Sequence, residues 1–367
     1  MSFTVEPFAL ANYARQLDRA SGDSSAIAGY IGTYAKDATG GELIAMAADG
    51  HRHAVTVISD TMRRLTTLLD ASAPELVATS MYYRLNDLAT AASLDRTFPG
   101  AAPCQPPTAL EQELTTLACL PPPFADMWDV TASLTPPPEP SNPPNALGWM
   151  DNISPTSWAM QGFDVVFGFD PISWLQERLF GNWEALATMQ PVLTNVGSAL
   201  HDLALNTQTG AATLRQVWQG QAGDAAYSYF TQLSTAAAAL RGPLNDIGNE
   251  YKAMADSVWS ISEAIGGIIK GLIDAAIIAG IAAAAGTVTS ATGVGAIVGY
   301  GVAAVEVAYM LKLWGQATQL YQHASAAVLA FRSALTHRLA DLESVKLPTL
   351  PGGSGYDHPV ASAGGAR

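Results

Sequence analysis

The chain has 367 residues, of which 14% are charged, and its 32 acidic and 18 basic residues give a formal net charge of −14 at pH 7. Nucleic-acid binding needs clustered Lys and Arg for phosphates, and an anionic lipid surface needs a basic face, so this balance opposes both. The length suffices for two or three domains, and the many Ala residues, the best helix formers, favour an all-α fold.

Residues 1–98 are predicted to form a long antiparallel helical hairpin, with Pro7 near the start of its first helix. On both sides of Gly40-Gly41, apolar residues recur three and four positions apart, which places them along one side of a helix. The stripes include Leu10, Tyr13, Leu17, Ile27 and Ile31 before the glycines, and Ile44, Val55, Ile58, Met62, Leu65 and Leu76 after them. Slender arms of this kind are unstable alone, so we expect this hairpin to pack against another.

Two histidines in the second arm, His51 and His53, do not form a metal site in this interpretation. Their spacing of two residues points them to different sides of a helix, and no Cys or acidic cluster completes a ligand set. We expect His51 to lie in the seam of the hairpin and His53 to be solvated.

The second arm finishes with Tyr83-Arg84-Leu85-Asn86-Asp87. The motif falls at the C-terminal end of a long helix, where we expect the ring of Tyr83 and the carboxylate of Asp87 to share one face at i, i+4. The alternative stays open that Tyr83 only continues the seam and Asp87 is solvated.

Residues 99–145 form a proline-rich linker, since proline forbids long helices and favours extended conformations. A short helix is expected at 110–120. Both cysteines, Cys104 and Cys119, lie in the linker, and the sequence leaves open whether they are two thiols or a disulfide, which would add about 2 to 4 kcal/mol of stability.

Residues 146–180 are rich in aromatic side chains and short polar turns, and we expect a loop-like lid packed on the helices, with a ligand-binding surface as the alternative. Asp170 and Pro171 are expected to start the helical region that follows, as cap and first helical residue.

Residues 181–270 are predicted to form a second hairpin, with its bend at Trp218-Gln219-Gly220. The apolar spacing holds from Leu186 to Leu203 and again from Phe230 to Ile268, as one continuous second arm. Gly220 permits backbone angles closed to other residues. Trp218 either covers the open end of the hairpin or offers its indole to a partner.

Residues 271–345 are predicted to form an apolar C-terminal helical hairpin rich in Gly and Ala, and residues 346–367 a disordered tail. The uncharged apolar runs 275–286 and 293–305 are shorter than the roughly 18 to 20 residues that span a bilayer, so they are not a committed transmembrane pair. Close packing inside a bundle is the favoured role. The alternative is a membrane contact through small residues of the segment 265–305, namely Gly280, Gly286, Gly293 and Gly295.

A hairpin that ends in Tyr-x-x-x-Asp, together with one whose bend is Trp-x-Gly, resembles the substrates of bacterial type VII (ESX) secretion, which include the small WxG-motif dimers, the PE/PPE pairs and EspB-like proteins. In that family the substrate is exported folded as a four-helix pair, and the two motifs lie side by side as a bipartite export signal for an FtsK-like ATPase. The resemblance implies that Trp218 and Gly220 act with Tyr83 and Asp87. It covers residues 4–95 and 180–270.

The expected fold is therefore all-α, with long antiparallel hairpins in a four-helix bundle. The first residues lack the basic and apolar regions of a secretory signal peptide, so we expect no cleaved leader. No phosphate loop, nucleophile elbow or metal spacing occurs, so we expect neither an enzyme nor a cofactor. The resemblance implies a secreted or cell-envelope protein that is exported by the secretion ATPase and then has a structural or binding role. A small WxG-family partner or chaperone, homo-oligomers, and a membrane-active effector or toxin-carrier function that uses residues 265–305 remain alternatives.

Overall fold

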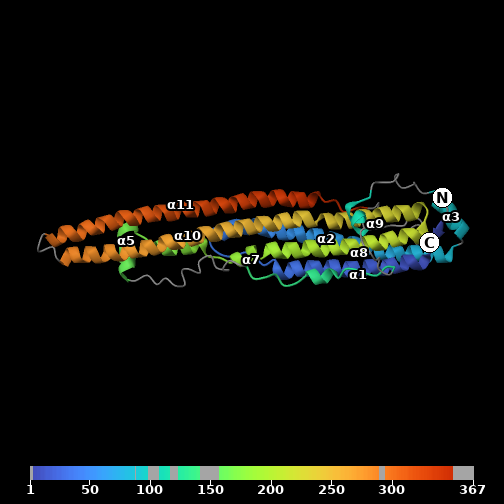
Figure 1. The fold of residues 1–367 in the computed structure, drawn as a ribbon, viewed down its shortest axis with the longest axis horizontal. Helices are drawn as coiled ribbons and strands as arrows, with labels where there is room; N and C mark the ends of the chain where they lie inside the picture. Colours follow the sequence, from blue (N-terminus) through green and yellow to red (C-terminus); the bar gives the residue numbers. More distant parts are fainter. Residues whose placement is uncertain are drawn as a thin grey trace, which may run out of the picture.

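The protein is a long rod of helices that run nearly parallel to its long axis (Figure 1). This computed structural model describes residues 3–86, 88–97, 107–115, 123–140, 157–288 and 294–349. Almost all of the regular structure in these ranges is helical, which confirms the predicted all-α class. We call the end of the rod where α8 passes into α9 the proximal end, and the opposite end, where α10 finishes and α11 begins, the distal end.

Two hairpins lie together as a bundle. The first consists of α1 (Pro7–Tyr34) and α2 (Glu42–Leu85), and the second of α8 (Met189–Val217), α9 (Gln221–Ala239) and α10 (Arg241–Val288). Helix α8 packs against α1 as well as α9 and α10, so the apolar stripes of both hairpins face one shared core. Its largest fully buried side chains include Tyr13, Phe163, Trp218, Phe230 and Tyr251.

The bend of the first hairpin is tightly packed against the chain that leads into the second. Gly40 has a φ of +157° and forms an isolated antiparallel bridge with Gly181, while the amide of Gly41 donates to the carbonyl of Phe180 over 2.6 Å. A Cβ added at Gly40 would lie 2.6 Å from that carbonyl oxygen. The predicted Gly-Gly bend therefore needs glycine both for its backbone angle and for the close approach of another backbone.

The C-terminal helices differ from the prediction in extent. The expected continuous arm from Phe230 to Ile268 is two helices, since α9 finishes at Ala239 and α10 starts at Arg241, shortly before Pro243, which has no amide to donate. Helix α10 then continues to Val288. The apolar pair is thus the far half of two long helices, α10 and α11 (Val294–Ser344), and α11 also packs on α2.

The aromatic segment is more helical than the loop-like lid that was expected. It contains α5 (Ser157–Phe167) and α6 (Pro171–Leu179), followed by α7 (Trp183–Ala187). Asp170 caps α6 by accepting a hydrogen bond from the amide of Ile172 over 2.9 Å, and Pro171 is the first helical residue, as predicted. The remaining described elements are β1 (Thr4–Val5), α3 (Leu88–Asp95), α4 (Ala109–Thr115), η1 (Val130–Ser133) and β2 (Trp218–Gln219).

Candidate functional site

Tyr83 and Trp218 meet at the proximal end of the rod. Tyr83 lies in the last turn of α2, and Trp218 follows directly after α8, so the two hairpin ends are joined within one chain. Their ring centroids are 6.0 Å apart with an interplanar angle of 73°, an edge-to-face arrangement that is favourable for aromatic pairs. Burial raises the pKa of the Tyr83 phenol, and the neighbouring indole N–H of Trp218 partly offsets that rise. The phenol is therefore neutral across the physiological range.

The N-terminal segment covers the Trp-x-Gly bend. Strand β1 pairs antiparallel with β2, with Val5 opposite Trp218 and Thr4 opposite Gln219. The ring of Phe3 lies 5.9 Å from that of Tyr83. As a result the exposed fraction of Trp218 is only 1%. Trp218 was expected either to cover the open end of the hairpin or to offer its indole to a partner. In the structure the indole covers the hairpin end.

Gly220 holds a backbone conformation that other residues avoid, with φ +130° and ψ 179°. Beside it, the carboxylate of Asp95 accepts hydrogen bonds from the amides of Gln221 over 3.0 Å and Ala222 over 2.9 Å. These are the first amides of α9, which lack partners inside the helix and attract negative charge. Asp95 thus caps α9 from a distant part of the chain.

Asp95 is the residue of this site that sequence reasoning missed. It is buried, and it comes at the C-terminal end of α3, where the helix dipole disfavours an acid. That unfavourable position was the only signal in the sequence that this carboxylate has a partner elsewhere. It does not indicate which groups the carboxylate contacts.

The predicted site residues are brought together in part. Tyr83, Trp218 and Gly220 lie at one place, while Asp87 lies outside the described residues. The expectation that one helix carries both Tyr83 and Asp87 is wrong, because α2 ends at Leu85 and Asn86 is extended, with φ −107° and ψ 147°.

Three exposed apolar side chains lie at the start of α1 and the end of α2, and we call them the proximal patch: Phe8, Met81 and Leu85. Leu85, the last residue of α2, is 86% exposed. The guanidinium of Arg84 lies 5.0 Å from the centroid of the Phe8 ring, which joins the start of α1 to the end of α2. A partner at this end of the rod would therefore meet these side chains and not the buried aromatic pair.

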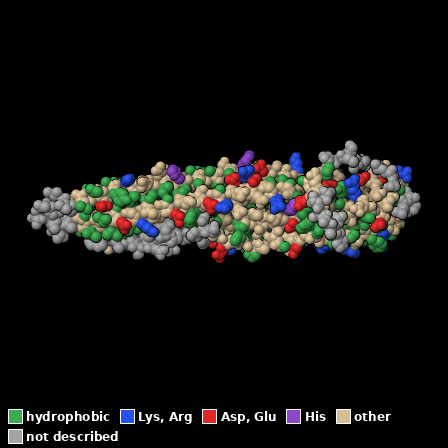
Figure 2. All heavy atoms as spheres, viewed as in Figure 1, with side chains coloured by type: hydrophobic (Ala, Val, Ile, Leu, Met, Phe, Trp, Pro, Cys, Tyr) green, Lys and Arg blue, Asp and Glu red, His purple; other side chains and the backbone are tan. Residues whose placement is uncertain are grey.

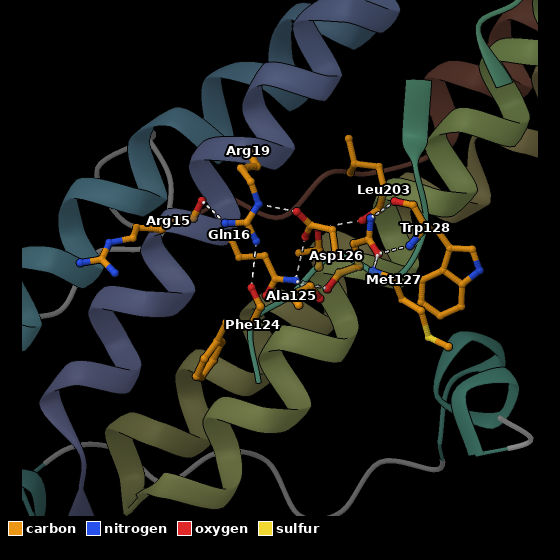
Figure 3. A network of polar contacts seen from close by, with 11 residues as sticks. Arg15, Gln16, Arg19, Phe124, Ala125, Asp126, Met127, Trp128 and Leu203 are labelled. Carbon is orange, nitrogen blue, oxygen red and sulfur yellow. Dashed lines mark hydrogen bonds and ion pairs between the residues drawn. The ribbon is translucent and has the colours of Figure 1, made fainter. Parts of the chain in front are cut away.

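Part of the proline-rich linker is fastened across α1 and α8 (Figure 3). The Nε2 amide of Gln16 donates to Oδ1 of Asp126 over 3.0 Å and to the carbonyl of Asn206 over 3.1 Å, and Arg19 forms an ion pair with Asp126. Asn206 in turn accepts from the amides of Met127 and Trp128 through Oδ1. These side chains satisfy linker backbone groups that no sheet or helix pairs.

His51 is buried in the seam, as expected, and joins three segments. Its Nδ1 lies 2.9 Å from the hydroxyl of Tyr251 on α10, and its Nε2 lies 2.9 Å from the carbonyl of Lys36. Because a carbonyl only accepts, Nε2 carries the proton and Nδ1 accepts from the tyrosine. Burial lowers the pKa of His51, while the Lys36 carbonyl and the Asp37 charge raise it.

The structure describes the other sequence-predicted positions only in part or not at all. Cys104, Cys119 and Gly293 lie outside the described residues, and Gly280 is a half-buried position of α10. Gly286 and Gly295 belong to α10 and α11, at positions where only the backbone is described. Within the described ranges, no group of three or more His, Cys, Asp or Glu is arranged to hold a metal ion.

Comparisons of the chain with known protein families, with curated proteins and with solved structures found no match.

Proposed function

We propose that this protein is a non-enzymatic substrate of a type VII secretion system, exported folded and acting at the cell envelope or outside the cell. The observation that carries the proposal is the contact of Tyr83 with Trp218, which joins the ends of two hairpins within one chain. In the secretion substrates that the chain resembles, the Trp-x-Gly and Tyr-x-x-x-Asp motifs lie side by side at the ends of two hairpins.

The partner of this signal is the secretion ATPase. Since Trp218 is buried, the indole supports the signal from inside, and the ATPase contacts the exposed side chains of the proximal patch and, as the resemblance implies, the carboxylate of Asp87. Exposed apolar side chains favour binding because a partner buries them, and the carboxylate of the motif would set the orientation of that partner.

Secretion of surface variants tests the proposal. Leu85→Ser changes an exposed side chain and leaves the core intact, and Asp87→Asn removes the charge of the Tyr-x-x-x-Asp motif, so both proteins should fold and stay inside the cell. The matched control is Leu329→Ser, which changes another exposed leucine, 51% exposed, on α11. Normal export of both Leu85→Ser and Asp87→Asn would contradict the proposal. Trp218→Ala is less informative, since loss of a buried tryptophan costs about 3 to 5 kcal/mol and can unfold the chain.

A second candidate function is a membrane-active effector or toxin-carrier protein that uses residues 265–305. Among the described residues, the helical stretch Gln221–Ala282 is long and apolar enough, by length and composition alone, to cross a membrane. Core helices of soluble proteins meet the same criterion of length and apolar composition. Exposed apolar side chains in this region are therefore stronger evidence for membrane contact. Dye leakage from liposomes that is lost in the double variant Gly280→Glu, Gly295→Glu favours this candidate, and absence of leakage removes it.

A further inference from the structure

An acidic residue is buried at the proximal end of the rod, on the short helix α3 that follows α2 (Figure 1). Ala91 and Asp95, four positions apart on one face of α3, are both buried. Charged side chains of both signs are seen on the surface of this end (Figure 2), where water solvates them, whereas only 6% of Asp95 is exposed. Burial of a carboxylate is costly unless hydrogen-bond donors surround it, so the donors around Asp95 indicate its role.

Those donors are the first amides of α9. Gly220 precedes α9 and has no side chain that could cap the helix. Asp95 caps it from another part of the chain, since Oδ2 accepts from the amide of Gln221 over 3.0 Å and Oδ1 from that of Ala222 over 2.9 Å. Each oxygen of the carboxylate thus takes one amide. Charge-assisted bonds of this kind are roughly twice as strong as bonds between neutral groups.

The same carboxylate lies beside the aromatic contact of the two hairpins. A Cβ added at Gly220 would be 2.7 Å from Oδ2 of Asp95 and 3.0 Å from the Phe3 ring. The Phe3 ring is itself 5.9 Å from that of Tyr83. Burial raises the pKa of the Tyr83 phenol most, and the negative charge of Asp95 adds to that rise. Asp95 is therefore close both to the bend at Gly220 and to the tyrosine at the end of α2.

Two fixed points enclose the part of the signal that a partner reaches. Tyr83 fixes the end of α2 through its contact with Trp218, and Asp95 fixes the end of α3 through its bonds to α9. Leu85 and Asp87, which the export proposal assigns to the contact with the ATPase, lie in the sequence between these two points. Without the bonds of Asp95, the chain between them would be held at one end only, and the bend would lose its helix cap.

We propose that Asp95 is a positioning residue of the export signal, which holds the Trp-x-Gly bend beside the end of α2 by capping α9. Its carboxylate is buried, so it arranges the signal from inside and does not touch the ATPase. Helix α2 stops at Leu85, so it does not carry the acid of the Tyr-x-x-x-Asp motif. Asp95 supplies the fixed geometry that a continuous helix would otherwise provide. This inference rests on the proposed export function.

The test replaces Asp95 by asparagine, which keeps the shape of the side chain and one oxygen acceptor but removes the charge. The matched control is Asp170→Asn, since Asp170 also caps a helix, α6, by accepting from the amide of Ile172 over 2.9 Å. Helix α6 packs on α2 and leads to the bend of the first hairpin. The control therefore loses a cap of the same kind outside the export signal.

The purified full-length proteins, labelled with 5-fluorotryptophan, are compared by fluorine NMR. The chain has eight tryptophans, and the resonance of Trp218 is the one that is lost in Trp218→Phe. We expect circular dichroism to show that both asparagine variants fold, and the Trp218 resonance to shift or broaden in Asp95→Asn but not in Asp170→Asn. In cells that export the wild type, secretion of Asp95→Asn should fall several-fold, while that of Asp170→Asn stays unchanged.

A second variant weakens the same contact and keeps the charge. Gln221→Pro removes one of the two amides that donate to Asp95, at the first position of α9, where proline is tolerated. Its Trp218 resonance and its export should change in the same direction as in Asp95→Asn, but to a smaller degree. If Asp95→Asn does not fold, the comparison of Gln221→Pro with the wild type decides the test.

An unchanged Trp218 resonance in the folded variants would overturn the inference, whatever happens to export. Normal export of a variant whose Trp218 resonance has changed would also overturn it, since the position of the bend would then not matter. Equal loss of export in Asp95→Asn and Asp170→Asn would do the same, because it indicates a general effect of lower stability. The export proposal fails separately, through normal export of Leu85→Ser and Asp87→Asn, and the NMR comparison of purified proteins does not depend on that result.

Discussion

Replacement of Gly220 by alanine tests whether the Trp-x-Gly bend is set by backbone geometry. The φ of +130° with ψ of 179° belongs to a region that is almost restricted to glycine, so alanine there costs about 1 to 3 kcal/mol. The added Cβ would also lie 2.7 Å from Oδ2 of Asp95 and 3.0 Å from the Phe3 ring. Displacing the carboxylate weakens its hydrogen bonds to the first amides of α9, and hydrogen bonds to a charged group contribute about 1.5 to 3 kcal/mol.

We therefore expect Gly220→Ala to lower the free energy of unfolding by about 2 to 5 kcal/mol, measured by urea denaturation followed by circular dichroism. The matched control is Gly22→Ala in the interior of α1, where no atom lies within 4 Å of the added Cβ. That control should be stabilised by about 0.5 to 1 kcal/mol, because alanine is the better helix former. If Gly220→Ala unfolds at the same urea concentration as the wild type while Gly22→Ala is stabilised, the reasoning about the bend is refuted.

Two further predictions concern the buried polar contacts. Burial lowers the pKa of His51 in the folded state, so the unfolded chain binds the proton first as pH falls below about 6.5. The free energy of unfolding should therefore decrease between pH 7 and pH 5, by up to about 1.4 kcal/mol per pH unit. His51→Gln should lose stability at pH 7 but show a smaller decrease on acidification, and equal slopes of urea midpoint against pH would exclude this role. Asn206→Ala removes three hydrogen bonds to the linker backbone at Met127 and Trp128. At about 1 kcal/mol for each bond, the free energy of unfolding should fall by about 2 to 3 kcal/mol. Limited proteolysis should then cut the linker near residues 123–135 faster than in the wild type, and an unchanged cleavage rate would show that these bonds do not hold it.

Much of the helical architecture followed from local patterns. The apolar spacing before and after Gly40-Gly41 predicted two antiparallel helices, and the structure has them as α1 and α2. Asp170 and Pro171 predicted the start of a helix, and both are at the expected positions of α6. These features were readable because a periodic stripe or a cap depends only on residues within a few positions of one another.

The partners of buried polar groups were not readable in the same way. Nothing local connects Asp95 with the amides of Gln221 and Ala222, which are more than a hundred positions further along the chain. The same holds for His51 with Tyr251. Whether such groups meet depends on how far each helix continues and on which face of the bundle it joins.

The extent of the helices was also misjudged where the local signal was ambiguous. An apolar spacing that continues through Leu240 does not reveal the break before Arg241, and the spacing around Tyr83 does not reveal that α2 ends at Leu85. By itself the sequence determined that the chain is helical, where its first hairpin bends and which stripe of each helix is buried, because periodicity and glycine positions are local properties. Only the tertiary structure decided that α10 serves both the bundle and the distal pair and that Asp95 completes the Trp-x-Gly bend, because these depend on distances between segments far apart in the sequence.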